Sequence, residues 1–193
     1  MILLNILEKS NQLHHLKSKP VKNVAIICIT CFVLFAQTHS VMAQITHCQH
    51  LWLDPISLYA APGETISISL YYDVTSNDNT LLGFGFRMFF NSTLLSFQKA
   101  NAFFNMFKAP VIQEDDEDLD NDPTTDQYIL IAWFEWNGRW PGERLPCFMG
   151  NIDFLIDPEA PTDVTTLNVN ITATHPGYQG CLHSSKIYIK PKQ

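Results

Sequence analysis

Residues 62–74, PGETISISLYYDV, mark this chain as a β-protein. The Pro62-Gly63 pair is a turn signal. From Ile66 to Val74 every second residue is apolar, and Ser, Tyr and Asp fill the positions between. A period of two, carried by β-branched and aromatic residues, predicts a half-buried strand over residues 65–74.

The same pattern returns along the rest of the chain. A broken first strand is expected around Pro55, and Asn137-Gly138 is a hairpin-type turn. Further strands are predicted at residues 51–53, 57–60, 82–90, 94–97, 128–136, 147–156, 164–173 and 186–189. Many short strands joined by Gly, Pro and Asn turns, with little helical periodicity, predict an all-β, two-sheet β-sandwich.

The first 43 residues have the features of a signal peptide. Four lysines precede an apolar run, residues 24–36, and Val41-Met42-Ala43 supplies an A-x-A-like cleavage site. The apolar run is short for a membrane span, which needs about 20 residues. We expect one exported domain over residues 44–193, secreted or periplasmic, with no membrane span once the signal is removed; an uncleaved anchor helix is the alternative.

The charge of residues 44–193 excludes one class of partner. These residues hold 8 basic and 18 acidic side chains. Nucleic-acid binding requires a basic patch that displaces counterions from phosphates. We therefore expect no nucleic-acid partner.

Three cysteines remain beyond the signal segment: Cys48, Cys147 and Cys181. Cys48 and Cys181 lie near the two ends of the domain, and domain termini are often close together, so a Cys48–Cys181 disulfide is the preferred pairing in an oxidising compartment. Cys147 is expected to be a buried, inert thiol. The alternative is a zinc site, because Cys48-x-His50 and Cys181-x-His183 both have ligand-type spacing.

An acidic segment, residues 114–126, reads EDDEDLDNDPTTD and holds eight carboxylates in thirteen positions. Such crowding favours a shared cation, and several oxygens at short range suit Ca²⁺. The spacing predicts a calcium site formed by Asp116, Asp118, Asp120, Asp122 and Asp126. An EF-hand is excluded, since Asn121 and Gln127 stand where that loop needs Gly and Glu. A solvated loop without metal is the alternative.

Tryptophans provide the candidate ligand-binding residues. Trp136 is the last residue of the predicted strand at residues 128–136 and shares a face with Phe134, and Trp140 lies beside Pro141-Gly142 in an expected loop. Exposed Trp rings stack on ligands and anchor protein partners, so Trp136 and Trp140 are predicted to bind a ligand, Trp140 being the more exposed. Core packing of these rings is the alternative.

Three segments carry a resemblance to bacterial cohesin-type domains. LDPISLYAAPGETISISLYYDV, residues 53–74, resembles the opening of such domains, and LLGFGFRMFFNSTLLSF, residues 81–97, is similar to the segment that follows. The later block, residues 114–156, resembles cohesin-like proteins of Gram-negative bacteria; it comprises the acidic loop, TDQYILIAWFEW, NG, WPGERLP and GNIDFLI. In cohesin-type domains a tyrosine-aspartate-proline-like turn precedes the leucine-rich strand. This chain has Phe90-Asn91-Ser92 at that turn and so departs from the family pattern. The resemblance covers residues 51 to about 190.

The resemblance implies a nine-stranded jelly-roll sandwich and a non-catalytic function. In cellulosomes, cohesins hold dockerin modules on one sheet face, so a dockerin-like protein partner is implied. The alternative is a polysaccharide-binding module that uses Trp136 and Trp140. No nucleophile elbow, zinc-protease motif or phosphate-binding loop is present, and no enzymatic activity is expected.

Overall fold

The structure is a computed structural model that describes residues 47–103 and 110–191. These residues form strands joined by turns and loops, with no helix among them. The strands are β1 (His47–Asp54), β2 (Ser57–Ala60), β3 (Thr65–Val74), β4 (Thr80–Leu81), β5 (Gly83–Phe90), β6 (Leu95–Asn101), β7 (Val111–Glu114), β8 (Gln127–Phe134), β9 (Trp140–Pro141), β10 (Cys147–Ile156), β11 (Asp163–Ala173), β12 (Tyr178–His183) and β13 (Ser185–Ile189).

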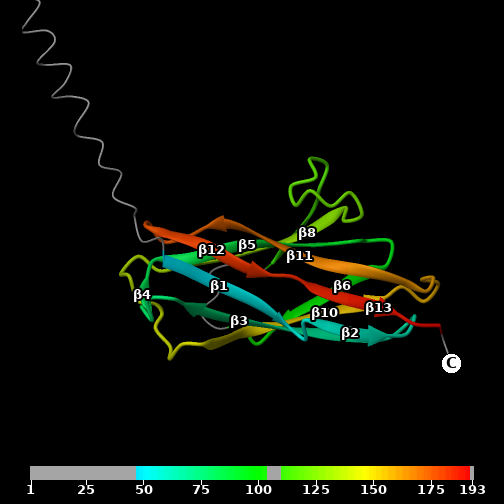
Figure 1. Cartoon of the computed structure of the whole chain (residues 1–193), viewed down its shortest axis with the longest axis horizontal. Coiled ribbons are helices and arrows are strands. Elements are labelled where there is room, and N and C mark those ends of the chain that lie inside the picture. The colour runs from blue at the N-terminus through cyan, green and yellow to red at the C-terminus, as the bar shows by residue number, and fades with distance from the viewer. Residues whose placement is uncertain (1–46, 104–109, 192–193) are drawn as a thin grey trace, which may run out of the picture. The chain divides into compact units, whose positions relative to one another are not determined.

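Two sheets pack face to face as a β-sandwich (Figure 1). The five-stranded sheet has the order β12-β1-β3-β10-β6, and the six-stranded sheet has the order β2-β13-β11-β5-β8-β7. A third, two-residue pairing joins β4 to β9. The predicted all-β, two-sheet fold is confirmed.

Side-chain alternation builds the core between the sheets. In β3 the five alternate residues from Ile66 to Val74 are buried, while those between them are exposed or half-buried. In β5 the inward residues are Phe84, Phe86, Met88 and Phe90, each at most 1% exposed. Burial of these large side chains supplies the main driving force for folding.

The first and the last segments of the domain each cross from one sheet to the other, and the two crossings are adjacent. The chain leaves the five-stranded sheet after Asp54 and enters the six-stranded sheet at Ser57, because Pro55 has no N–H for a continuous ladder. The chain crosses likewise between β12 and β13. β1 therefore pairs in parallel with β12, and β2 with β13. At the crossing, the Ser185 hydroxyl donates a 2.7 Å hydrogen bond to the Pro55 carbonyl.

Strand boundaries agree with the predictions where the alternation is clear. Residues 57–60, 65–74 and 147–156 form the predicted strands without shift. The short β4, β7 and β9 and the late β12 were not predicted. The proposed signal segment, residues 1–43, lies outside the described residues and stays a prediction. In the described part of the chain, no helix has the length and apolarity that a membrane crossing requires.

Candidate functional site

The outer face of the six-stranded sheet carries the acidic loop at one end and the Phe134–Trp136 pair at the other. On β5 the residues that point away from the core are Gly83, Gly85, Arg87 and Phe89. Their register partners on the two neighbouring strands extend this face. The partners are Phe134, Ala132, Leu130 and Tyr128 on β8, and Ala173, Asn170 and Asn168 on β11. We call this surface the β11-β5-β8 face.

The acidic loop, residues 115–126, connects β7 to β8 and is held against one end of this face (Figure 1). Its two ends are closed by a 2.8 Å hydrogen bond from the Asp115 N–H to the Asp126 carbonyl. The side-chain amide of Asn168 donates to Asp120 and to Asp122, at 2.9 Å each. The Asn170 amide donates to the Leu119 carbonyl at 3.0 Å. The loop is therefore attached to β11 by side chains as well as to its own strands.

Three carboxylates of the loop converge. One oxygen from each of Asp115, Asp118 and Asp120 lies within 4.8 Å of the others. Asp115 is buried, Asp120 half-buried and Asp118 exposed. Oxygen ligands at such separations suit a hard cation, so this cluster could hold a metal ion. A hollow of about 390 Å³ lies beside it, lined by Leu119, Asp120, Asn121, Asp122, Asn168 and Asn170 among others.

Burial and crowding act on the protons of this loop. Desolvation raises the pKa of Asp115, and the neighbouring charges of Asp120 and Asp118 add to the rise, while hydrogen bonds from the Leu119 N–H oppose it. The pKa of Asp122 is lowered, first by the hydrogen bond from the Thr124 hydroxyl. A cation would relieve the repulsion that raises the Asp115 pKa.

The structure gathers only part of the predicted ligand set. Asp118 and Asp120 are in the cluster, and Asp122 lies next to it through the shared Asn168 amide. Asp116 is exposed and outside the cluster. Asp126 is also outside, because its carboxylate accepts the Ser92 N–H and hydroxyl, both at 2.6 Å.

Asp115 was missed by the sequence reasoning. The assumption of strictly alternate ligands skipped it, although its position directly after a strand places it where the loop turns inward. The left-handed backbone at Asp118, with φ of 51°, breaks that alternation.

An aromatic pair lies at the other end of the same face. The Trp136 ring is 83% exposed and Phe134 is 46% exposed. Their ring centroids are 4.4 Å apart with planes at 90°, an edge-to-face contact. Trp133 points the opposite way and is 2% exposed.

The prediction that Trp140 is exposed is wrong. Trp140 is 2% exposed and packs against Tyr72, Phe84 and Trp133, with ring centroids 4.6, 6.3 and 6.0 Å away. The short β4–β9 pairing, in which Leu81 faces Trp140, folds this segment back over the end of the core. A buried ring offers no face to a sugar.

Between the loop and the aromatic pair the face carries small residues. A Cβ on Gly83 would meet the Trp133 carbonyl oxygen at 2.2 Å, and φ of 142° at this position also requires glycine. Gly85 lies beside Ala132 and Thr172, both of which are exposed. This part of the face therefore carries no large side chains, and the rings of Phe134 and Trp136 project beside it.

The remaining cysteine predictions concern the other sheet. Cys48 and Cys181 form a disulfide that joins β1 to β12, so the predicted pairing is present. His50 lies near both sulfurs, but disulfide-bonded cysteines are not zinc ligands. Cys147 is a buried free thiol, and desolvation raises its pKa to about 11, as expected for an inert cysteine.

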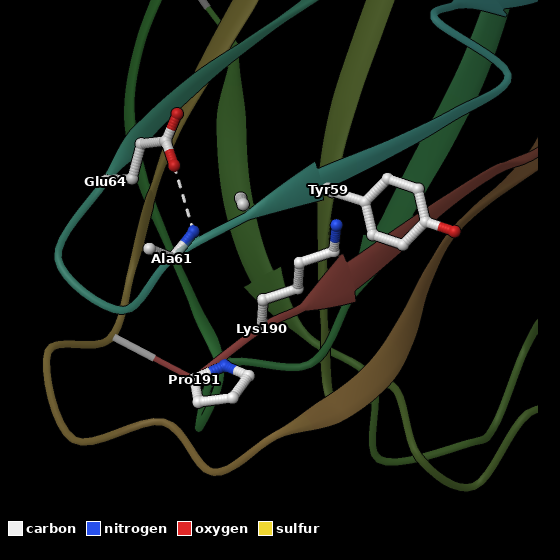
Figure 2. Close-up of a pocket in the computed structure, with 6 residues that line it drawn as sticks. Tyr59, Ala61, Glu64, Lys190 and Pro191 are labelled. Atoms are coloured by element: carbon white, nitrogen blue, oxygen red, sulfur yellow. Dashed lines mark hydrogen bonds between the residues drawn. The ribbon is translucent and has the colours of Figure 1, made fainter. Parts of the chain in front are cut away.

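A second hollow, of about 280 Å³, lies at the end of β2 (Figure 2). Figure 2 shows Lys190 beside Tyr59; its ammonium is 3.7 Å from the ring centroid. Glu64 accepts the Ala61 N–H at 2.9 Å. The two charged groups already have partners, and no constellation of nucleophile and base lines this hollow.

Comparison with known proteins gives a likeness in structure only. No family model matches the sequence, and no curated protein is close enough in sequence to count as a relative. The seventh ScaB type I cohesin of Pseudobacteroides cellulosolvens is similar at a TM-score of 0.56 and 10% identity, over 76% of this chain and 94% of that one.

Two clostridial structures are similar to this chain to a comparable degree. The CaCohA2 solution structure from Clostridium acetobutylicum has a TM-score of 0.51 and 11% identity, over 75% of this chain and 90% of that one. A chain of the Coh-OlpA-Doc918 complex from Clostridium thermocellum, a type I cohesin-dockerin complex, has a TM-score of 0.50 and 12% identity, over 75% and 99% of the two chains. The chain therefore has a cohesin-like β-sandwich fold.

Proposed function

We propose that this chain is a non-catalytic binding module that holds a dockerin-like protein partner on the β11-β5-β8 face. The observation that carries the proposal is the exposed Phe134–Trp136 pair, which projects beside a low surface of small residues on a cohesin-like fold. Large aromatic side chains dominate the binding energy of protein interfaces. A solved complex of the same fold, from Clostridium thermocellum, is a cohesin-dockerin complex.

The proposal includes a calcium ion in the acidic loop. Asp115, Asp118 and Asp120 would supply oxygens, with Asp122 beside them. Ca²⁺ accepts six to eight oxygen ligands and tolerates irregular geometry, which suits a loop of carboxylates. The ion would neutralise the crowded charges and keep the loop fixed at the edge of the binding face.

The proposal also includes export to the periplasm or the medium. The predicted signal segment and the Cys48–Cys181 disulfide both support it, because disulfides persist in oxidising compartments. The alternative function predicted from sequence, polysaccharide binding through Trp136 and Trp140, loses one of its two rings to the core.

Partner binding is tested with purified dockerin modules of several types against the immobilised protein. We expect at least one to bind, and Phe134→Ala/Trp136→Ala to weaken it tenfold or more, since loss of a hot-spot residue costs about 2 kcal/mol or more. Tyr59→Ala is the matched control, because this ring is 63% exposed on a different part of the same sheet. Equal loss in the control, or no binding to any module, would contradict the proposal.

Calcium is tested by melting the protein in EDTA and in added CaCl₂. A ligand that binds only the native state must raise the melting midpoint. We expect a calcium-dependent rise that disappears in Asp118→Asn/Asp120→Asn. An identical midpoint in EDTA and in calcium would exclude the ion without affecting the partner assay.

A further inference from the structure

The outer face of the five-stranded sheet carries a row of aromatic side chains that sequence reasoning did not detect. Trp52 of β1 is directly opposite Tyr71 of β3, and Tyr71 is directly opposite Phe148 of β10. On the far side of Trp52, His183 of β12 continues the row. We call Trp52, Tyr71 and Phe148 the aromatic row.

The rings of the row contact one another and remain open to solvent. The Trp52 and Tyr71 planes lie 15° apart with centroids separated by 5.5 Å, and Phe148 is edge-on to Tyr71 at 5.7 Å. Phe148 is 40% exposed, and the other two rings are half-buried. The spacing of these rings is close to the length of one sugar residue in an extended β-1,4-linked chain.

A row of polar side chains runs beside the rings. Asp54, Ser69, Asn151 and Asn101 follow one another in register across β1, β3, β10 and β6. The Ser69 hydroxyl donates to the Asn151 side-chain oxygen at 2.9 Å. This leaves the side-chain NH₂ group of Asn151 as a donor for a ligand.

One further step along the sheet lies a charged group. Asp153 accepts hydrogen bonds from Ser67 at 2.7 Å and from Asn101 at 3.0 Å, and Lys99 is 3.6 Å from it. The polar rows therefore offer both donors and acceptors in a fixed order beside the rings.

The charges select the class of ligand. Asp54, Asp73 and Asp153 lie on this face, and Lys99 is already paired with Asp153. Carboxylates repel anionic chains such as uronates and nucleic acids. They accept hydrogen bonds from hydroxyl groups. A β-1,4-linked polysaccharide is a flat chain with C–H groups on its faces and hydroxyls along its edges.

We propose that this face binds an uncharged β-1,4-linked polysaccharide. The ring faces and edges of the aromatic row contact the C–H groups of the sugar residues, and the Asp54–Asn101 row binds the hydroxyls. The binding surface lies on the opposite sheet from the proposed protein-binding face. The two activities are therefore separable, and the failure of one leaves the other in place.

The experiment uses three defined probes: microcrystalline cellulose, chitin and soluble hydroxyethylcellulose. We expect the protein to be retained by at least one of them and not by polygalacturonate, an anionic control. Trp52→Ala/Phe148→Ala should reduce retention tenfold or more. Tyr59→Ala is the matched control, because this ring is 63% exposed and lies on the other sheet.

Three outcomes would overturn the proposal. The first is no retention of the unmodified protein by any of the three uncharged probes. The second is equal retention of the unmodified protein and Trp52→Ala/Phe148→Ala. The third is dimerisation in sedimentation that Trp52→Ala/Phe148→Ala abolishes, because the face would then be covered by a second copy.

A second measurement does not require the double variant to fold. Indole oxidation by N-bromosuccinimide is mapped by mass spectrometry on the unmodified protein, with and without cellohexaose or chitohexaose. Bound sugar should protect Trp52 at least threefold and leave Trp136 unprotected. Equal reactivity of Trp52 in the presence and absence of both oligosaccharides would contradict the inference.

Discussion

Trp136 and Trp140 are four residues apart, yet solvent reaches 83% of one side chain and 2% of the other. The difference comes from the turn at Asn137-Gly138, where Gly138 has φ of 63°. The turn sends the chain back across the end of the sandwich, and Trp140 is inserted among Tyr72, Phe84 and Trp133. Trp136 is left on the outer side.

The two tryptophans should therefore differ in their effect on stability. Trp140→Ala should lower the free energy of unfolding by about 3–5 kcal/mol, because it leaves a large cavity between aromatic rings. Trp136→Ala should change it by no more than about 0.5 kcal/mol, as is usual for exposed positions. Urea titrations of both variants measure this, and similar losses would refute the assigned burial.

At the scale of the element, the acidic loop is a connection between two strands whose carboxylates repel one another. Asp115 is buried beside Asp118 and Asp120, and desolvation and these neighbouring charges raise its pKa, so without a cation the charged form of Asp115 is disfavoured in the folded loop. Asn168 and Asn170 hold the loop to β11 in spite of this repulsion. The loop is stabilised by neighbours that compensate its charge only in part.

The effect of this repulsion on the stability of the metal-free protein depends on pH. The pKa of Asp115 is raised above its unfolded-state value, near 3.9. The stability that the protonated Asp115 side chain contributes is complete below that unfolded-state value. It is lost as the pH rises through the folded-state pKa. In EDTA, Asp115→Asn should therefore gain stability relative to the unmodified protein as the pH rises above about 4. Urea midpoints over this range measure the gain; a constant difference would contradict it.

The same loop shows what sequence patterns determine and what they do not. Local alternation predicted β3 and β10 without shift, because one buried face fixes the pattern within a single strand. The cluster of Asp115, Asp118 and Asp120 depends on left-handed backbone at Asp118 and on Asn168 from a distant strand. No local pattern encodes such a contact.

The aromatic row was missed for a related reason. Trp52, Tyr71 and Phe148 each occupy an outward position of their own strand. Their proximity depends on the register among three strands, which the sequence of any one strand does not specify. The β4–β9 pairing that buries Trp140 is equally non-local.

At the scale of the whole molecule, the two ends of the domain are fastened together. Parallel pairs join β1 to β12 and β2 to β13, and the Cys48–Cys181 disulfide closes a loop with a sequence separation of 133. A crosslink over so long a loop restricts the unfolded chain strongly.

Removing this crosslink should lower stability without changing the fold. Cys48→Ala/Cys181→Ala should lose about 2 to 5 kcal/mol of unfolding free energy. Dithiothreitol should reproduce the loss in the unmodified protein and have no effect on the double variant. Non-reducing peptide maps should contain linked Cys48 and Cys181 peptides, and their absence would remove the basis of this prediction.

The crossing of both terminal segments at Pro55 and Ser185 also sets the order in which the domain is completed during synthesis. β2 has a single strand partner, β13, which is made more than a hundred residues later. Until the last strands emerge, β2 has no partner and one edge of β1 is open, and such edges favour aggregation. A ribosome-bound chain that ends before residue 178 should therefore bind chaperones that recognise extended segments, whereas release of the last strands ends that dependence.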